Sequence, residues 1–177
     1  MTKYLFILFS ALALGHISIA FADDHSGTIN ITGSINAHTC EVAAASKDFT
    51  VALGQFHPQD FLQTGAVTSM QAFIITLEKC AYEVTTATVT FNGESDTDRP
   101  ELLKVDASAE SATGLAVAIL DSNRAIIPLK TESPAYTLSS NSVQIFDLQF
   151  YAQYISTRTI VTPGDAGATA TFQLHYE

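Results

Sequence analysis

From residue 28 onward, apolar and polar residues alternate along this chain in short runs. Thr28–Thr32 has isoleucine at every second position, and Phe49–Leu53 alternates in the same way. Because successive side chains of a strand point to opposite faces, a period of two predicts half-buried β-strands. Further runs, rich in β-branched and aromatic residues, occupy 73–77, 86–91, 115–120, 143–154 and 169–176.

Turn residues separate these runs, as at Asn92-Gly93 and Pro163-Gly164-Asp165. No helical periodicity of useful length occurs between them. Only the segment 59–71 leaves two alternatives open, a short helix or a strand that crosses between sheets. About seven strands, with no break in composition, predict an all-β fold built as one β-sandwich.

The start of the chain has the features of an export signal. Lys3 gives a positive start, the run 4–14 is almost wholly apolar, and Ala20-Phe21-Ala22 fits the small-x-small pattern of a cleavage site. We therefore expect residues 1–22 to be a secretory signal peptide that is cut after Ala22. The alternative is a single membrane anchor, which His16 and the cleavage pattern disfavour.

Export changes the meaning of the two cysteines, Cys40 and Cys80, which both lie in the predicted mature chain. An oxidising compartment and an even number of cysteines favour one disulfide bond between them. Metal binding would need further ligands at close spacing, and none flank either cysteine. A bridge over a segment of this length contributes about 4 kcal/mol in the chain-entropy description.

Charge and histidine positions argue against several classes of function. A net charge of -10 repels phosphate backbones, so we expect no nucleic-acid partner. None of the five histidines lies in a metal or catalytic-triad motif, and neither Gly-x-Ser-x-Gly nor His-Glu-x-x-His occurs. We therefore expect no enzyme activity, no catalytic residue, no cofactor and no bound metal.

Two short segments carry weak metal signals. Glu94–Glu101 is acidic, but its spacing lacks the EF-hand pattern, and a solvated loop is the better interpretation. If cleavage follows Ala22, the mature chain begins Asp23-Asp24-His25, whose amine, amide and imidazole nitrogens are able to bind Cu(II). Chance is the better explanation of that sequence.

Several short motifs stand in a fixed order along the mature chain. They are Gly33 seven residues before Cys40, Leu77–Cys80, Phe91–Gly93, Gly114–Asp121, the Leu-x-Phe-x-Ala-x-Tyr run Leu148–Tyr154, Gly164 and the penultimate Tyr176. Together, over essentially the whole mature chain, they resemble the structural pilin subunits of chaperone–usher fimbriae, the type 1 fimbrial protein family.

The resemblance implies an incomplete immunoglobulin-like sandwich, the pilin fold, completed by a donor strand from a neighbouring subunit. A periplasmic chaperone first lends a strand, and the N-terminal extension of the next subunit then replaces it, which is a known case of strand addition. The expected partners are other pilin subunits, in a homo- or heteropolymer, the chaperone and an outer-membrane usher. The expected destination, after export through the periplasm, is a cell-surface fimbria that supports adhesion.

The extension that such a mechanism needs is residues 23–37, ahead of a pilin domain at 38–177. Ile29, Ile31, Gly33 and Ile35 share one strand face, and the resemblance assigns them to the donor strand. Glycine is poor in a strand interior and often marks the close approach of another backbone. From alternation alone, an ordinary first strand of the chain's own sandwich is the better interpretation, and the resemblance reverses that preference.

The C-terminal run alternates as well, with Phe172, Leu174 and Tyr176 on one face. The resemblance assigns these residues, together with Gly164, to the strand that the chaperone binds. A core strand is the alternative for the three large residues, and both interpretations are compatible. A turn after Pro163 would by itself explain Gly164.

The resulting prediction is a structural pilus subunit that polymerises by donor-strand exchange. The alternative is a minor adaptor or a carbohydrate-binding adhesin component of a fimbria. A tip adhesin of this kind needs a lectin domain ahead of the pilin domain, and the short stretch between Ala22 and Cys40 leaves no room for one. The lack of tryptophan also weakens a sugar-stacking site.

Overall fold

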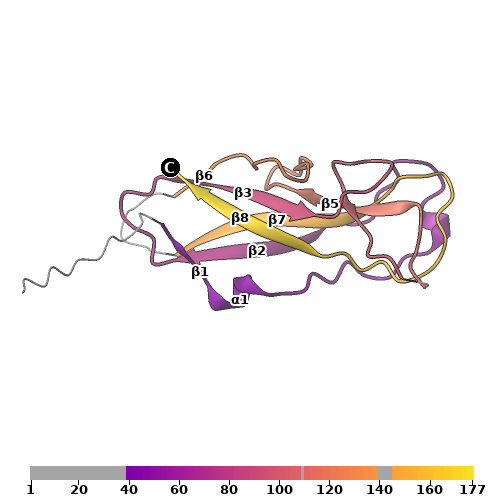
Figure 1. Ribbon diagram of the computed structural model, residues 1–177, viewed down its shortest axis with the longest axis horizontal. Coiled ribbons are helices and arrows are strands. Elements are labelled where there is room, and N and C mark those ends of the chain that lie inside the picture. The colour runs from indigo at the N-terminus through magenta and orange to yellow at the C-terminus, as the bar shows by residue number, and fades with distance from the viewer. Residues whose placement is uncertain (1–38, 109, 139–144) are drawn as a thin grey trace, which may run out of the picture. The chain divides into compact units, whose positions relative to one another are not determined.

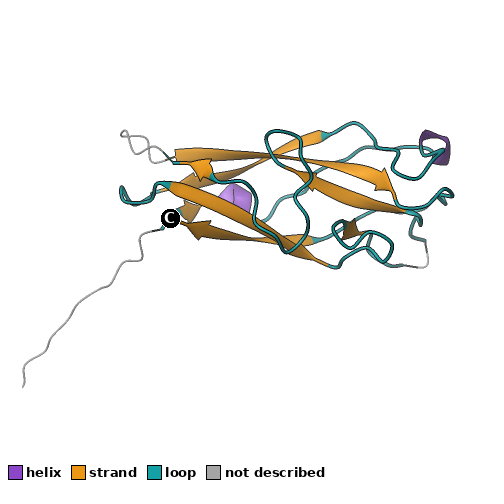
Figure 2. Cartoon of the chain, turned by 90° about the horizontal axis from the view of Figure 1, so that it is seen from above, coloured by secondary structure: helices purple, strands orange, loops and turns teal. Residues whose placement is uncertain are grey.

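Two antiparallel β-sheets face each other in the part of the chain that the structure describes (Figures 1 and 2). The structure, a computed structural model, describes residues 39–108, 110–138 and 145–177. The predicted signal peptide at 1–22 and the extension at 23–37 lie outside the described residues. The donor-strand residues Ile29, Ile31, Gly33 and Ile35 therefore lie outside them too.

The first sheet has five strands in the order β1-β2-β7-β5-β4. Its neighbours β2 and β7 pair over their whole shared length, although they are far apart in the sequence. The crossover between sheets that this order requires is typical of immunoglobulin-like sandwiches. The strands are β1 (Glu41–Val42), β2 (Gln71–Glu78), β4 (Leu103–Lys104), β5 (Leu115–Leu120) and β7 (Ile145–Ser156).

The second sheet has three strands in the order β6-β3-β8, so that β8 lies at its edge. These are β3 (Thr86–Gly93), β6 (Tyr136–Thr137) and β8 (Ala170–Tyr176). Helix is limited, among the described residues, to α1 (Ala44–Lys47) and the 3-10 helix η1 (Pro58–Asp60). The all-β prediction is confirmed.

One predicted strand does not form among the described residues, and the structure describes the segment 59–71, for which the sequence leaves both a short helix and a crossing strand open. Phe49–Leu53 alternates like a strand but forms none, because no described segment pairs with its main chain. The segment 59–71 holds the end of η1, a turn at Gly65 and a single bridge from Val67 to Ile155, and only at Gln71 does strand β2 begin. Pairing, rather than alternation, decides whether a run becomes a strand.

The two ends of the sandwich differ in what they contain (Figure 1). We call one the disulfide end, because β2 and β8 finish there and Cys40 and Cys80 are bonded to each other beside β1. We call the other the η1 end, where β7 finishes at Ser156 and β8 begins at Ala170. The disulfide predicted from the sequence is confirmed.

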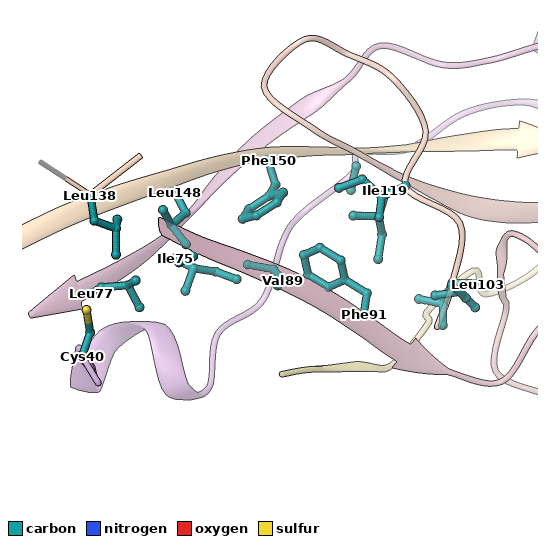
Figure 3. Packing of buried hydrophobic residues seen from close by; sticks show 14 of the residues in the cluster. Cys40, Ile75, Leu77, Val89, Phe91, Leu103, Ile119, Leu138, Leu148 and Phe150 are labelled. Atoms are coloured by element: carbon teal, nitrogen blue, oxygen red, sulfur yellow. The ribbon is translucent and has the colours of Figure 1, made fainter. Parts of the chain in front are cut away.

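Aromatic rings fill the middle of the interior, where the two sheets face each other. Phe150 of β7 is wholly buried, and its ring lies 5.1 Å from that of Phe91 on β3, centroid to centroid and nearly perpendicular (Figure 3). Phe73 and Tyr136 approach the same ring at 5.6 and 5.3 Å. Such offset and edge-to-face contacts add to the free energy gained from burial alone. Phe150 therefore ties both sheets together.

Phe150→Ala should lower the free energy of unfolding by about 3–5 kcal/mol, because it leaves a cavity between the sheets. Urea denaturation of the purified chain measures the loss. Ile145→Ala is the matched control in the same strand, since its side chain is exposed, and it should cost less than about 0.5 kcal/mol. Equal losses from the two variants would contradict this assignment of the core.

Candidate functional site: an open groove beside strand β8

The inward face of β8 is less buried than the strand beside it. Phe172, Leu174 and Tyr176 stand opposite Phe91, Val89 and Ala87 of β3 and point to the same interior. The three β3 residues are fully buried, whereas their three β8 partners remain partly exposed. Side chains that point to a core but stay half-exposed lack a neighbouring strand on one side of their own strand. That missing neighbour lies along the outer edge of β8.

The main chain of β8 is hydrogen-bonded on one side only. Thr86 and Glu177 exchange both main-chain hydrogen bonds, at 2.9 and 3.1 Å. Bonded pairs alternate along an antiparallel ladder, so Thr171, Gln173 and His175 also bond to β3. The N–H and C=O groups of Phe172, Leu174 and Tyr176 then point the other way, where no described strand pairs with them. Among the described residues, none pairs with the outer edge of β8.

The segment 49–56 forms the facing wall. Its main chain makes no hydrogen bond to another described residue. Phe49, Val51 and Leu53 turn their side chains toward the interior, and Phe49 remains more than a third exposed. The outer edge of β8 and the segment 49–56 therefore border opposite sides of the same opening, and neither main chain pairs there with a described strand.

Between the two walls lies a groove with a volume of about 810 Å³. Its floor comes from both sheets, because Phe73, Phe91, Val117 and Ile119 all reach it. Of the described residues that line it, Lys47 and Asp48 alone carry charge. An apolar floor between two unpaired main-chain edges fits an extended segment with alternating apolar side chains better than it fits a compact small molecule.

Tyr154, which lines the groove, and Tyr176, at the end of β8, each donate a hydrogen bond from the hydroxyl group to a main-chain oxygen. Tyr154 donates to the carbonyl of Ala166 at 2.7 Å, and Tyr176 donates to that of Cys40 at 3.4 Å. Burial raises the pKa of both hydroxyl groups, which keeps them neutral at physiological pH. The Tyr176 contact also places the disulfide end of the groove beside Cys40.

The structure brings three of the predicted C-terminal residues together and sets the fourth apart. Phe172, Leu174 and Tyr176 share the inward face of β8, and Phe172 lines the groove. Gly164 precedes β8 in a loop, where a Cβ atom would overlap the main chain of residues 110–112. Close packing against that loop accounts for a glycine at this position.

Sequence reasoning missed the floor and the facing wall. The alternation of Phe49, Val51 and Leu53 was visible, but no local pattern says that this run lacks a partner strand. The floor residues look like ordinary core residues in the sequence, because burial depends on which strands become neighbours.

A metal site and a membrane-spanning helix each place requirements on the described residues. Within them, no group of three histidine, cysteine, aspartate or glutamate side chains is placed to hold a metal ion. Nor does any helix in the described ranges have the length and apolar character needed to cross a bilayer.

Comparison with known proteins gives consistent matches. A family described as "Fimbrial protein" matches residues 29–177. The chain is 40% identical over 153 residues to the uncharacterized fimbrial-like protein YcbV of Escherichia coli (strain K12), covering 86% of this chain and 87% of that protein. It is 34% identical over 180 residues to Long polar fimbria protein A of Salmonella typhimurium (strain LT2), covering 100% and 98% of the two chains.

Solved structures agree with the fold described above. A Burkholderia pseudomallei antigen and type I fimbria protein matches with a TM-score of 0.60 and 33% identity, over 78% of this chain and 89% of that chain. The P pilus rod subunit PapA matches with a TM-score of 0.64 and 23% identity, over 78% and 99%. The predicted pilin fold, an incomplete immunoglobulin-like sandwich, is confirmed.

Hydrogen exchange should alternate along β8 in the free subunit. The amides of Gln173 and His175 should exchange at least about tenfold more slowly than those of Phe172 and Leu174, because only the former bond to β3. Amide-resolved exchange by NMR measures this difference, and the amides of Thr88 and Thr90 in β3, which stand in bonded pairs with β8, serve as the protected internal control. Uniform protection along β8 would mean that its outer edge is already paired.

Proposed function

This chain belongs to the fimbrial protein family, and we propose that its subunits join by donor-strand exchange. It is a structural subunit of a fimbria, which polymerises with other pilin subunits at the cell surface. In the proposed mechanism, the groove beside β8 receives an extended segment from the next subunit. The observation that carries the proposal is the pair of unpaired main-chain edges on either side of an apolar floor.

We propose that the inserted segment is the extension at 23–37. Its apolar positions Ile29, Ile31 and Ile35 recur with the period of a strand, as the groove requires. Burying one such isoleucine contributes about 1.5–3 kcal/mol. Each main-chain hydrogen bond to β8 adds a net contribution of about 0.5–1.5 kcal/mol. An inserted strand would thus gain free energy both from main-chain hydrogen bonds to the edge of β8 and from burial of its isoleucines on the groove floor.

The position of Cys40 favours one direction for the inserted strand. The body of each subunit begins at Cys40, which lies at the disulfide end beside Tyr176. A donor parallel to β8 would leave the groove at that same end of the acceptor. The acceptor's own extension also starts at the disulfide end. The donor subunit and the subunit that receives the acceptor's extension would therefore have to occupy the same space at that end. We therefore infer that the donor runs antiparallel to β8 and leaves at the η1 end.

Before assembly, the same open edge needs protection, because an exposed sheet edge over an apolar groove promotes aggregation. We propose that a periplasmic chaperone covers β8 through Phe172, Leu174 and Tyr176 until an outer-membrane usher exchanges it for the extension. A signal peptide at 1–22 would bring the chain to that compartment. The role is structural, and we propose no catalytic step.

Ile31→Asp should block joining, because it places a carboxylate in an apolar groove and forfeits the burial of the isoleucine. We expect the assembly rate of purified subunits to fall more than tenfold, as each loss of about 1.4 kcal/mol corresponds to a factor of ten. Asn30→Asp is the matched control, since it adds the same charge on the opposite face. Gly33→Leu should also impair joining, because overpacking costs about 1–3 kcal/mol.

The contrary outcome is specific. If the Ile31→Asp and Gly33→Leu subunits polymerise at the rate of the Asn30→Asp control, the extension is not the inserted segment. All variants should still be captured by the chaperone, because the substitutions lie outside the described sandwich.

Tyr176→Ala should weaken chaperone capture, because β8 loses the large side chain at the disulfide end of the groove. A loss of about 1.5–3 kcal/mol of burial corresponds to roughly ten- to a hundredfold less complex. The amount of subunit that co-purifies with the periplasmic chaperone measures the effect. His175→Ala, on the outward and exposed face of the same strand, should leave it unchanged. Equal capture of the two variants would remove Tyr176 from the proposed interface.

A further inference from the structure

Large apolar side chains are exposed together at the η1 end. Leu62 is 81% exposed, Ile160 75% and Val67 52%. Ser156 Oγ, at the end of β7, donates to the carbonyl of Gln63 at 2.7 Å and accepts from the amide of Ala66 at 3.0 Å, which holds the segment 62–67 beside this strand end. Ile160 follows four residues after Ser156 on the chain that leaves β7. We call these three side chains, Leu62, Val67 and Ile160, the η1 patch.

The opposite end of the sandwich also exposes apolar surface. Tyr82, two residues after Cys80, is 78% exposed, and Ile145, the first residue of β7, is 58% exposed. Ile145 stands opposite Glu78 in the ladder between β2 and β7, which keeps it next to the strand that leads to Cys80. We call Tyr82 and Ile145 the disulfide-end patch.

Chain length determines how far these two patches can be apart in a fibre. If Ile35 of one subunit lies in the groove of another, at most about 3.6 Å per residue separates it from Cys40, so the reach is no more than roughly 18 Å. The donor leaves the acceptor at the η1 end, and the donor's body begins at its own disulfide end. The two ends must therefore meet.

We propose that the η1 patch of one subunit packs against the disulfide-end patch of a second copy of this chain, as an interface additional to the inserted strand. This inference rests on the donor-strand exchange proposed above. The occupant is a second copy because the short link at 36–39 brings only that copy to this end.

The charges near the two patches are compatible with such a contact. Arg158, two residues before Ile160, is paired with Asp98 at 2.5 Å, and Lys79, next to Cys80, is paired with Glu41 at 2.9 Å. Each ion pair lies within one subunit, so neither patch presents an adjacent unpaired charge from these residues to its partner. Glu78 stands opposite Ile145 and Glu83 follows Tyr82, so the disulfide-end patch has acidic neighbours. The exposed apolar side chains are the part of the two ends that can be buried by contact.

The test uses fibres assembled from the full mature chain and measures the rate at which subunits dissociate in denaturant. Ile160→Asp and Tyr82→Lys should each raise that rate about tenfold, equivalent to about 1.4 kcal/mol. When one chain carries both substitutions, every junction places an aspartate on one patch and a lysine on the facing patch, and the rate should fall below that of either single variant. Ile74→Asp, an exposed position in the middle of β2, is the matched control and should leave the rate unchanged.

A second measurement separates this contact from strand insertion. A synthetic peptide of residues 23–37 should bind the full chain equally well with or without Ile160→Asp, because the peptide brings no second body to the η1 end. Unchanged dissociation of both single variants, an equal effect of Ile74→Asp, or no recovery in the double variant would overturn the contact. A peptide that fails to bind the original chain would instead overturn donor-strand exchange, and this contact with it.

Discussion

Within the described residues, strand β8 is hydrogen-bonded along one edge only, and the groove beside it depends on that missing pairing. Its inward residues Phe172, Leu174 and Tyr176 belong to the core but stay half-exposed, because no described strand covers their other side. The run Phe49–Leu53, which has the alternation of a strand, lacks strand pairing for the same reason. A strand missing from the described sandwich thus explains both walls of the groove, and an added strand would extend the ladder of β8, cover the half-exposed core residues and fill the groove.

The disulfide makes the two ends of the sandwich different, because it fixes Cys40 at one of them. Cys40 is held to Cys80 at the end of β2, and the hydroxyl of Tyr176 reaches the carbonyl of Cys40. Cys40, which follows the proposed extension in the sequence, is therefore fixed at the end of the sandwich where β8 finishes. In the proposed fibre, the extension that starts at the disulfide end of one subunit lies in the groove of a neighbour. The extension that lies in that subunit's own groove comes from a body at its η1 end. Repeating this contact produces a head-to-tail chain that does not close into a ring.

Local patterns in the sequence predicted much of this fold. The period of two located β2, β3, β5, β7 and β8, and the even cysteine count in an exported chain predicted the disulfide. Those patterns do not reveal which strands become neighbours, and so they could not show that Phe49–Leu53 would remain unpaired. The same limit applies to the groove floor, and to Gly164, whose close approach to residues 110–112 depends on tertiary packing.

The central claim is that the extension of one copy completes the sandwich of another, and a cryo-EM map of the assembled fibre that separates β-strands tests it most directly. Our account predicts a continuous strand along the outer edge of β8, with Ile29, Ile31 and Ile35 of the next subunit over the floor formed by Phe73 and Phe91. That strand should run antiparallel to β8 and connect to Cys40 of the next subunit at the η1 end. A map in which each extension folds back into the groove of its own subunit, or in which the edge of β8 stays open, would contradict it.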